Sequence, residues 1–200
     1  MKKLFIVTLL INMNTVLYGM NQEQFNEQSS DFQPFTIAAF LALEPTITTD
    51  HAQQITNLLT DAINISTQDE DGNTTLHLTI KYGYSELATT LITLGANIEA
   101  RNNNGDTALL IAARYNRTVI TSILLSKNAD ITAQTNYGNT VLHVAAWYGH
   151  VLIASLVGKK CTSIIMVKNS KDETALDFAR QQNTPEMIIF LEELITPSMV

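Results

Sequence analysis

The sequence predicts an all-α fold, a solenoid of stacked helix–turn–helix units with hairpin-like turn loops. One segment recurs along the chain: Gly72, Gly105 and Gly138 mark three equally spaced copies, and Asp172 marks a fourth copy after an interval that is longer by one position. Apolar residues recur at helical spacing within each copy and at fixed offsets between copies. Such a period indicates units that bury their apolar faces only against their neighbours.

Each copy carries the signals for two helices. The threonine that follows the glycine-containing turn is expected to cap an inner helix through its hydroxyl. A second turn then ends that helix, because Gly and Asn both tolerate a left-handed backbone, and an outer helix follows. The expected caps are Thr74, Thr107, Thr140 and Thr174, and the expected turns are at Gly83, Asn116, Gly149 and Asn183.

The third copy resembles the ankyrin repeat most closely. The matching residues are Gly138, Thr140, Leu142, His143, Ala145, Ala146, Gly149 and His150. The resemblance covers about residues 69–194, although no copy has the family's Pro after Thr and the last copy has Asp177 in place of His. The resemblance implies an ankyrin-repeat solenoid whose function is to bind another protein.

The period and the composition divide the chain into seven segments. Residues 35–68 match the repeat only weakly and residues 169–196 have lost part of it, which suits terminal repeats with one face lacking a neighbour. The expected segments are a signal peptide (1–20), a polar linker (21–34), a degenerate N-terminal capping repeat (35–68), three ankyrin repeats (69–101, 102–134 and 135–168) and a C-terminal capping repeat (169–196).

The N-terminus has the pattern of an export signal. Lys2 and Lys3 precede an apolar run over residues 4–11, which is too short and too interrupted to span a bilayer. We therefore expect an exported protein, which is periplasmic, secreted or delivered to a host cell, with no stable membrane insertion after cleavage. An N-terminal membrane anchor or a buried helix is the alternative.

Charge and cysteine usage narrow the partner classes. The formal net charge is −7, so a phosphate backbone would be repelled and nucleic acid is not an expected partner. The single cysteine, Cys161, rules out an intramolecular disulfide. We expect a monomer that binds a protein partner.

No constellation of residues predicts catalysis, a metal or a cofactor. His77 and His143 lie two repeats apart, or about 20 Å if repeats stack at the distance of packed helices, and this is too far to share a metal. Both are expected to be buried and to satisfy backbone groups of the turn. The acidic run 69–71 fails as a calcium loop because the EF-hand register places Leu78 where a bidentate glutamate is required. The sequence therefore predicts a protein that is not an enzyme.

The ankyrin resemblance implies that a partner contacts the turn tips and the concave face of the inner helices. Tyr82, Tyr115 and Tyr148 recur with the same period as the glycines and should form a ladder, although they could equally be scaffold residues that pack on the next repeat. An acidic edge at residues 69–71 and 106 would favour a basic partner. The predicted partner-binding residues are Trp147, Tyr148, Tyr115, Tyr82, Tyr137, Arg114, Lys81, Asp71, Asn104 and Asp106.

These features lead to one main functional hypothesis and two alternatives. The main hypothesis is an exported, non-catalytic ankyrin-repeat protein that binds a protein partner through its concave groove and turn tips. The alternatives are a secreted effector of a host-associated bacterium that acts on host proteins, and a non-catalytic or immunity-type subunit of an enzyme.

Overall fold

The structure is a computed structural model, and it describes residues 68–196. Four helix pairs follow one another in this region, and a short 3₁₀ helix, η1 (Thr162–Ile164), separates the third pair from the fourth. The predicted all-α solenoid is confirmed. The expected signal peptide and linker lie outside the described residues, as does the degenerate repeat except for Gln68. The pairs are α4 (Thr75–Tyr82) with α5 (Ser85–Thr93), α6 (Ala108–Arg114) with α7 (Thr118–Ser126), α8 (Val141–Trp147) with α9 (Val151–Lys160), and α10 (Ala175–Gln181) with α11 (Pro185–Ile195).

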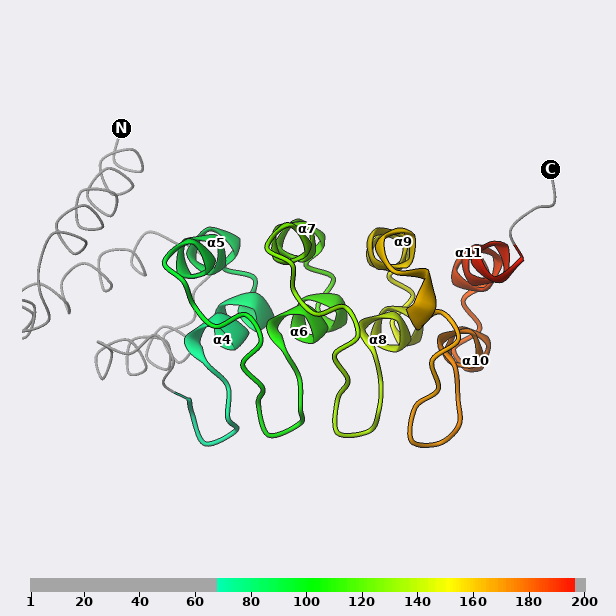
Figure 1. Cartoon of the computed structure of the whole chain (residues 1–200), viewed down its shortest axis with the longest axis horizontal. Coiled ribbons are helices and arrows are strands. Elements are labelled where there is room, and N and C mark those ends of the chain that lie inside the picture. Colours follow the sequence, from blue (N-terminus) through cyan, green and yellow to red (C-terminus); the bar gives the residue numbers. More distant parts are fainter. Residues whose placement is uncertain (1–67, 197–200) are drawn as a thin grey trace, which may run out of the picture. The chain divides into compact units, whose positions relative to one another are not determined.

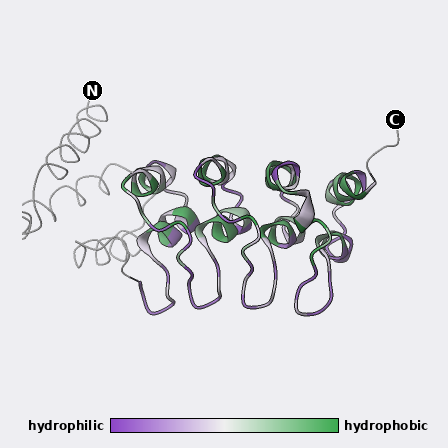
Figure 2. Ribbon diagram, in the orientation of Figure 1, coloured by the Kyte–Doolittle hydropathy of each residue, from purple (hydrophilic) through white to green (hydrophobic). Residues whose placement is uncertain are grey.

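The helices form two parallel rows (Figure 1). Helices α4, α6, α8 and α10 make the inner row, and α5, α7, α9 and α11 make the outer row. A hairpin loop precedes each inner helix and projects from the same side of the stack. Hydrophobic residues are concentrated in the helices and hydrophilic residues in the hairpin loops (Figure 2). The core therefore lies between helices of neighbouring repeats, as a solenoid requires.

The inner helices begin where the threonines predicted them. Thr74, Thr107, Thr140 and Thr174 are the N-caps of α4, α6, α8 and α10, and each has the extended backbone typical of that position. In three of the four helices the third helical residue also bonds back to the cap residue, which completes a capping box. Helix α6 is the exception, because it has the apolar Leu110 at that place.

The inner helices end at residues with left-handed backbone. The φ angles are 87° at Gly83, 55° at Asn116, 70° at Gly149 and 51° at Asn183. This confirms the predicted turns. The chain reverses immediately afterwards, and the outer helix begins two residues beyond each of them.

The recurring apolar positions build the core. Leu76, Leu109 and Leu142 occupy equivalent places in the inner row and expose 1% of their surface or less. Leu91, Leu124, Val157 and Leu191 do the same in the outer row, with 3% exposure at most. None of the helices between residues 68 and 196 has the length and apolar character needed to cross a membrane.

Candidate partner-binding surface

A groove of about 380 Å³ opens across the inner helices α6, α8 and α10. It brings together Trp147, Tyr148 and Arg114, three of the residues predicted to bind a partner. Its wall also includes the last hairpin loop. The lining residues are Arg114, Asn139, Val144, Trp147, Tyr148, Lys171, Glu173, Phe178 and Gln181.

The aromatic side of the groove is held by contacts between repeats. The ring of Trp147 meets the ring of Phe178 in the next repeat at a tilted angle of 66°, with 5.2 Å between their centroids. Phe178 in turn meets the buried ring of His143 edge to face at 5.5 Å. Trp147 nevertheless keeps 40% of its surface exposed. The indole is therefore both accessible and fixed, a combination that suits a binding anchor.

A buried carboxylate holds Arg114 at the groove. Nη1 of Arg114 lies 2.8 Å from Oδ2 of Asp106, and Nη2 donates to Oδ1 at 3.0 Å. Asp106 has no exposed surface, and its burial raises the pKa of the carboxyl while the charge of Arg114 opposes that rise. The prediction that Asp106 contacts a partner at an exposed tip is therefore wrong: its side chain turns inward to pair with Arg114 and orients that guanidinium.

The tips of the hairpin loops form a fixed row. A backbone N–H group of each tip donates to a carbonyl of the preceding tip. Asn103 donates to Asp71 at 2.9 Å and Asn136 donates to Asn104 at 2.9 Å. In the last loop, Ser170 donates to Tyr137 at 3.0 Å. The side chains of Asp71, Asn104 and Tyr137 are all exposed, Tyr137 by 70%. Lys171 occupies the place in the last loop that follows these tips. These predicted tip residues thus lie on one accessible edge.

The three tyrosines occupy equivalent places at the ends of the inner helices. Tyr115 is 37% exposed and Tyr148 is 49% exposed, whereas Tyr82 is half-buried. Tyr148 lines the groove and stacks on His150 of its own repeat, with 5.7 Å between ring centroids. Tyr82 meets Tyr84 at 6.3 Å, and Nζ of Lys81 lies 5.5 Å from the Tyr82 ring centroid. The tyrosine column exists, but Tyr148 is the member that the groove includes.

Four groove residues come from the last repeat, where no binding residue was predicted. Lys171, Glu173, Phe178 and Gln181 belong to the segment 169–196, which the sequence predicts only as a cap. The repeat period could have found them. Gln181, for example, follows Trp147 by the same interval that separates Gly138 from Asp172, and it belongs to the same column.

The histidines serve the scaffold. Nδ1 of His77 accepts the backbone N–H of Thr74 at 3.1 Å, and Nε2 donates to the carbonyl of Asp106 at 3.0 Å. Nδ1 of His150 donates to the carbonyl of Ala113 in the preceding repeat at 2.8 Å. Between residues 68 and 196, no group of three or more His, Cys, Asp or Glu side chains could hold a metal ion. The structural interpretation of these histidines is confirmed.

Comparisons with known proteins agree with this scaffold. No curated protein matches the chain. The family model described as ankyrin repeats (3 copies) matches residues 46–135 and again residues 76–163, so that the two matches together span more than half of the chain. Repeats of this kind generally mediate protein–protein interaction and are typically non-catalytic. The recurring turn, the paired helices and these matches show that the chain belongs to the ankyrin-repeat family.

Proposed function

We propose that this chain is a non-catalytic binding module that holds a protein partner in the groove of α6, α8 and α10 and along the adjoining hairpin tips. The observation that carries the proposal is the exposed yet fixed Trp147, which rests on Phe178 inside a groove that Arg114 also lines. Trp, Tyr and Arg dominate binding hot spots. Here one of each, Trp147, Tyr148 and Arg114, lines a single groove.

The low entropic cost of ordering these side chains supports the same proposal. Trp147 is already in contact with Phe178, and Arg114 is already paired with Asp106. Ordering a free, rotamer-rich side chain on binding costs about 0.5–1.5 kcal/mol. Little of that cost remains when side chains are held before the partner arrives, so more of the contact energy is available for affinity.

The electrostatics of the groove support binding rather than proton transfer. The carboxylate of Glu173 accepts hydrogen bonds from Gln181 at 2.8 Å and from Asn169 at 3.3 Å. Hydrogen bonds from Gln181 first, and then from Asn169, lower the pKa of this carboxyl. Glu173 is therefore ionised at neutral pH and is a poor general acid.

The assignment of the groove as the binding surface can be tested with a matched pair of double variants. Trp147→Ala with Tyr148→Ala removes two exposed aromatics from the groove. Val119→Ala with Leu152→Ala removes two exposed apolar side chains, 67% and 69% accessible, from the outer helices α7 and α9. Partner proteins captured from the native source by each bait are quantified by mass spectrometry, and folding is checked by circular dichroism and melting.

We expect the groove variant to lose a stoichiometric partner while its circular dichroism spectrum stays that of the wild type. The outer-helix variant should keep the same partner. Capture that survives intact in the groove variant, or that falls equally in both variants, would show that the groove is not the binding surface.

We also propose that the protein acts after export, in the periplasm, the medium or a host cell, as a monomer. The basic start followed by a short apolar run supports this location. The test is to fractionate cells that express the chain with and without residues 1–20, each carrying a C-terminal tag. Export predicts that the longer form leaves the cytoplasm at a lower mass than its full length, and that the shorter form stays inside. Recovery of both forms in the cytoplasm at full length would contradict it.

A further inference from the structure

Most hydrogen-bond acceptors at the groove already have a partner within the protein, whereas several of its hydrogen-bond donors do not. The acceptors of the wall are already used: Asp106 is buried against Arg114, and both carboxylate oxygens of Glu173 accept side-chain amides. The amide oxygen of Asn139 likewise accepts a hydrogen bond from Asn169 at 2.9 Å. The capacity of the groove to form hydrogen bonds with a partner therefore lies mainly in its donors.

The donors that remain are strong and line the same groove as the aromatic residues. Arg114 has five N–H groups, of which one donates to Oδ1 of Asp106, while Nη1 forms a close ion pair with Oδ2. The ammonium of Lys171 makes no hydrogen bond or close ion pair within the described part of the chain, and neither does the indole N–H of Trp147. Arg114 comes from α6 and Lys171 from the last hairpin loop, so the two cations approach the groove from different repeats.

We infer that the groove receives a segment of the partner protein that presents a carboxylate side chain, Asp or Glu, beside an apolar one. This inference rests on the proposed function and specifies its partner. The carboxylate accepts hydrogen bonds from Arg114 and Lys171, and charge-assisted bonds of this kind are about twice as strong as neutral ones. The apolar side chain packs on Trp147 and Phe178, where the wall is aromatic.

A basic segment would meet the wrong charges at this place. It would face Arg114 and Lys171, with Asp106 out of reach below the surface. The one carboxylate that lines the groove, Glu173, already accepts hydrogen bonds at both oxygens and has Lys171 near it. The exposed acidic residues Glu70 and Asp71, which the sequence suggested would attract a basic partner, belong to the first described repeat and do not line the groove. The groove of α6, α8 and α10 therefore has its own charge preference.

The single tryptophan of the chain makes this inference directly measurable, because Trp147 is itself part of the groove. Random peptides displayed on phage are selected on the full chain, and binders that are retained by the Trp147→Ala, Tyr148→Ala variant are removed. The remaining sequences are synthesised, and their binding is titrated by the fluorescence of Trp147. We expect enrichment of Asp or Glu next to apolar residues, and a change in tryptophan fluorescence on binding.

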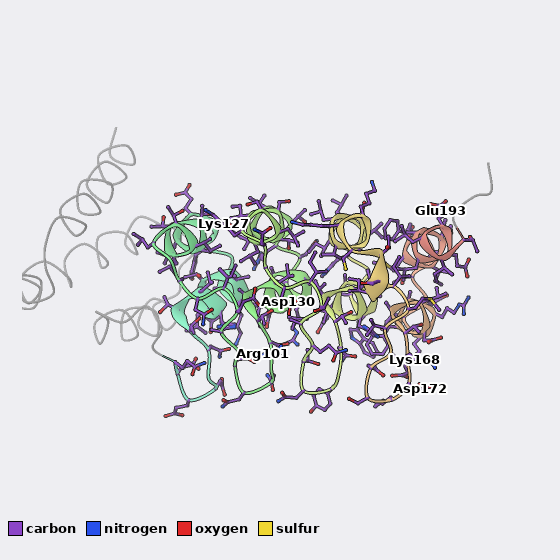
Figure 3. The ribbon with its side chains drawn as sticks, viewed as in Figure 1. Arg101, Lys127, Asp130, Lys168, Asp172 and Glu193 are labelled. Atoms are coloured by element: carbon purple, nitrogen blue, oxygen red, sulfur yellow. The ribbon has the colours of Figure 1, made fainter. Side chains whose placement is uncertain are left out.

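Two charge variants then test the role of Lys171. Lys171→Glu reverses the charge at the groove, and Lys127→Glu makes the same change of net charge at the end of α7, away from the hairpin loops (Figure 3). Both lysines are exposed, so neither change should affect folding. We expect Lys171→Glu to weaken binding of the selected peptides about 3- to 10-fold and Lys127→Glu to weaken it less than about 2-fold. The difference between the two variants should shrink as salt is added.

The outcomes separate this inference from the proposed function. Groove-dependent peptides that are basic or uncharged, or that bind Lys171→Glu as well as wild type, would overturn the acidic preference and leave the groove as the binding surface. A selection that yields no peptide sensitive to Trp147→Ala with Tyr148→Ala would overturn both.

Discussion

His77 of one repeat donates a hydrogen bond from Nε2 to the carbonyl of Asp106 in the next, at 3.0 Å. The other ring nitrogen accepts the N–H of Thr74 and so caps the helix on which His77 lies. His143 makes the equivalent bond to the carbonyl of Glu173. The last described repeat has Asp177 at this place, and its carboxylate accepts the N–H of Thr174 at 2.8 Å. The aspartate thus supplies the cap without the bond to a following repeat.

This relationship predicts the effect of His77→Leu. Leucine is the residue that the second repeat has at the same place, Leu110, so the shape is tolerated there. The carbonyl of Asp106 keeps its bond from the N–H of Asn102, but the buried N–H of Thr74 loses its acceptor. We expect the free energy of unfolding in urea to fall by about 1–3 kcal/mol, the cost of leaving one buried group unsatisfied.

Asp177→Leu is the matched control for His77→Leu. It removes a cap of the same geometry from α10 without removing a bond between repeats. Its effect on the urea midpoint should be smaller than that of His77→Leu. An equal or larger effect would mean that the bond from His77 to Asp106 adds nothing to the stacking of repeats.

A pH dependence follows from the same two histidines. Burial lowers the pKa of His77 and of His143 below the ordinary 6.5, although bonds to backbone carbonyls and nearby carboxylates oppose this. The unfolded chain therefore takes up protons near pH 6.5, while the folded chain does so only at lower pH. The contribution of the two neutral histidines to the free energy of unfolding is therefore complete above about pH 6.5. It is lost as the pH falls from there toward the pKa values of the folded chain.

We accordingly expect wild-type stability to be lower at about pH 5.5 than at about pH 7.5. The double variant His77→Leu, His143→Leu should show a smaller difference, because neither leucine titrates. Urea unfolding at the two pH values measures both. An unchanged difference in the double variant would locate the pH dependence elsewhere.

The repeat period predicts the scaffold well because its residues act within one unit or against an identical neighbour. Thr140 caps its own helix and Leu142 is buried in the core to which the equivalent Leu109 also belongs, so a recurring pattern contains the information. The groove is different. The inward turn of Asp106 depends on Arg114, which lies at the far end of the helix that follows it. Phe178 contacts Trp147 only because α8 and α10 pack together. Asp106 and Arg114 pair within a single repeat, and Trp147 meets Phe178 between two repeats. The period gives the column in which each of these residues lies, but it does not reveal the contacts between them.

The pair of Asp106 and Arg114 predicts a strong asymmetry between single and double variants. Arg114→Gln leaves a carboxylate in the interior without its cation, and removing one partner of a buried ion pair costs about 3–5 kcal/mol. Arg114 is partly exposed, so the loss should lie at the lower end of that range. Combining it with Asp106→Asn removes the stranded charge and should recover most of the lost stability in urea.

Acidification should distinguish the Arg114→Gln variant from its double. Burial already raises the pKa of Asp106, and loss of the opposing cation raises it further. A raised folded pKa means that the folded chain binds its proton first, so Arg114→Gln should regain stability, relative to the double variant, as the pH falls through that pKa. Parallel pH profiles of the two variants would contradict the stranded carboxylate.

Gly83 and Gly95 offer the sharpest test of how neighbouring repeats are joined. Both have φ of 87°, so an alanine at either place carries the same backbone strain of about 1–2 kcal/mol. A Cβ at Gly95 meets nothing within 4 Å, whereas one at Gly83 lies 2.9 Å from Nη2 of Arg117. Arg117 donates from Nε to the carbonyl of Ile80 and from Nη2 to that of Lys81, both at 3.0 Å, and so caps the end of α4 from the next repeat.

We therefore expect Gly83→Ala to destabilise the fold by about 1–2 kcal/mol more than Gly95→Ala, because the guanidinium must leave two helix-end carbonyls. In a chain that already contains Arg117→Ala, no guanidinium is present to displace, and the two glycine variants should become equal. Urea unfolding of the six chains, with and without each change, completes the comparison. If Gly83→Ala and Gly95→Ala are equivalent in the presence of Arg117, then the bonds from Arg117 to α4 do not contribute to the stacking, and packing of the apolar columns alone joins the repeats.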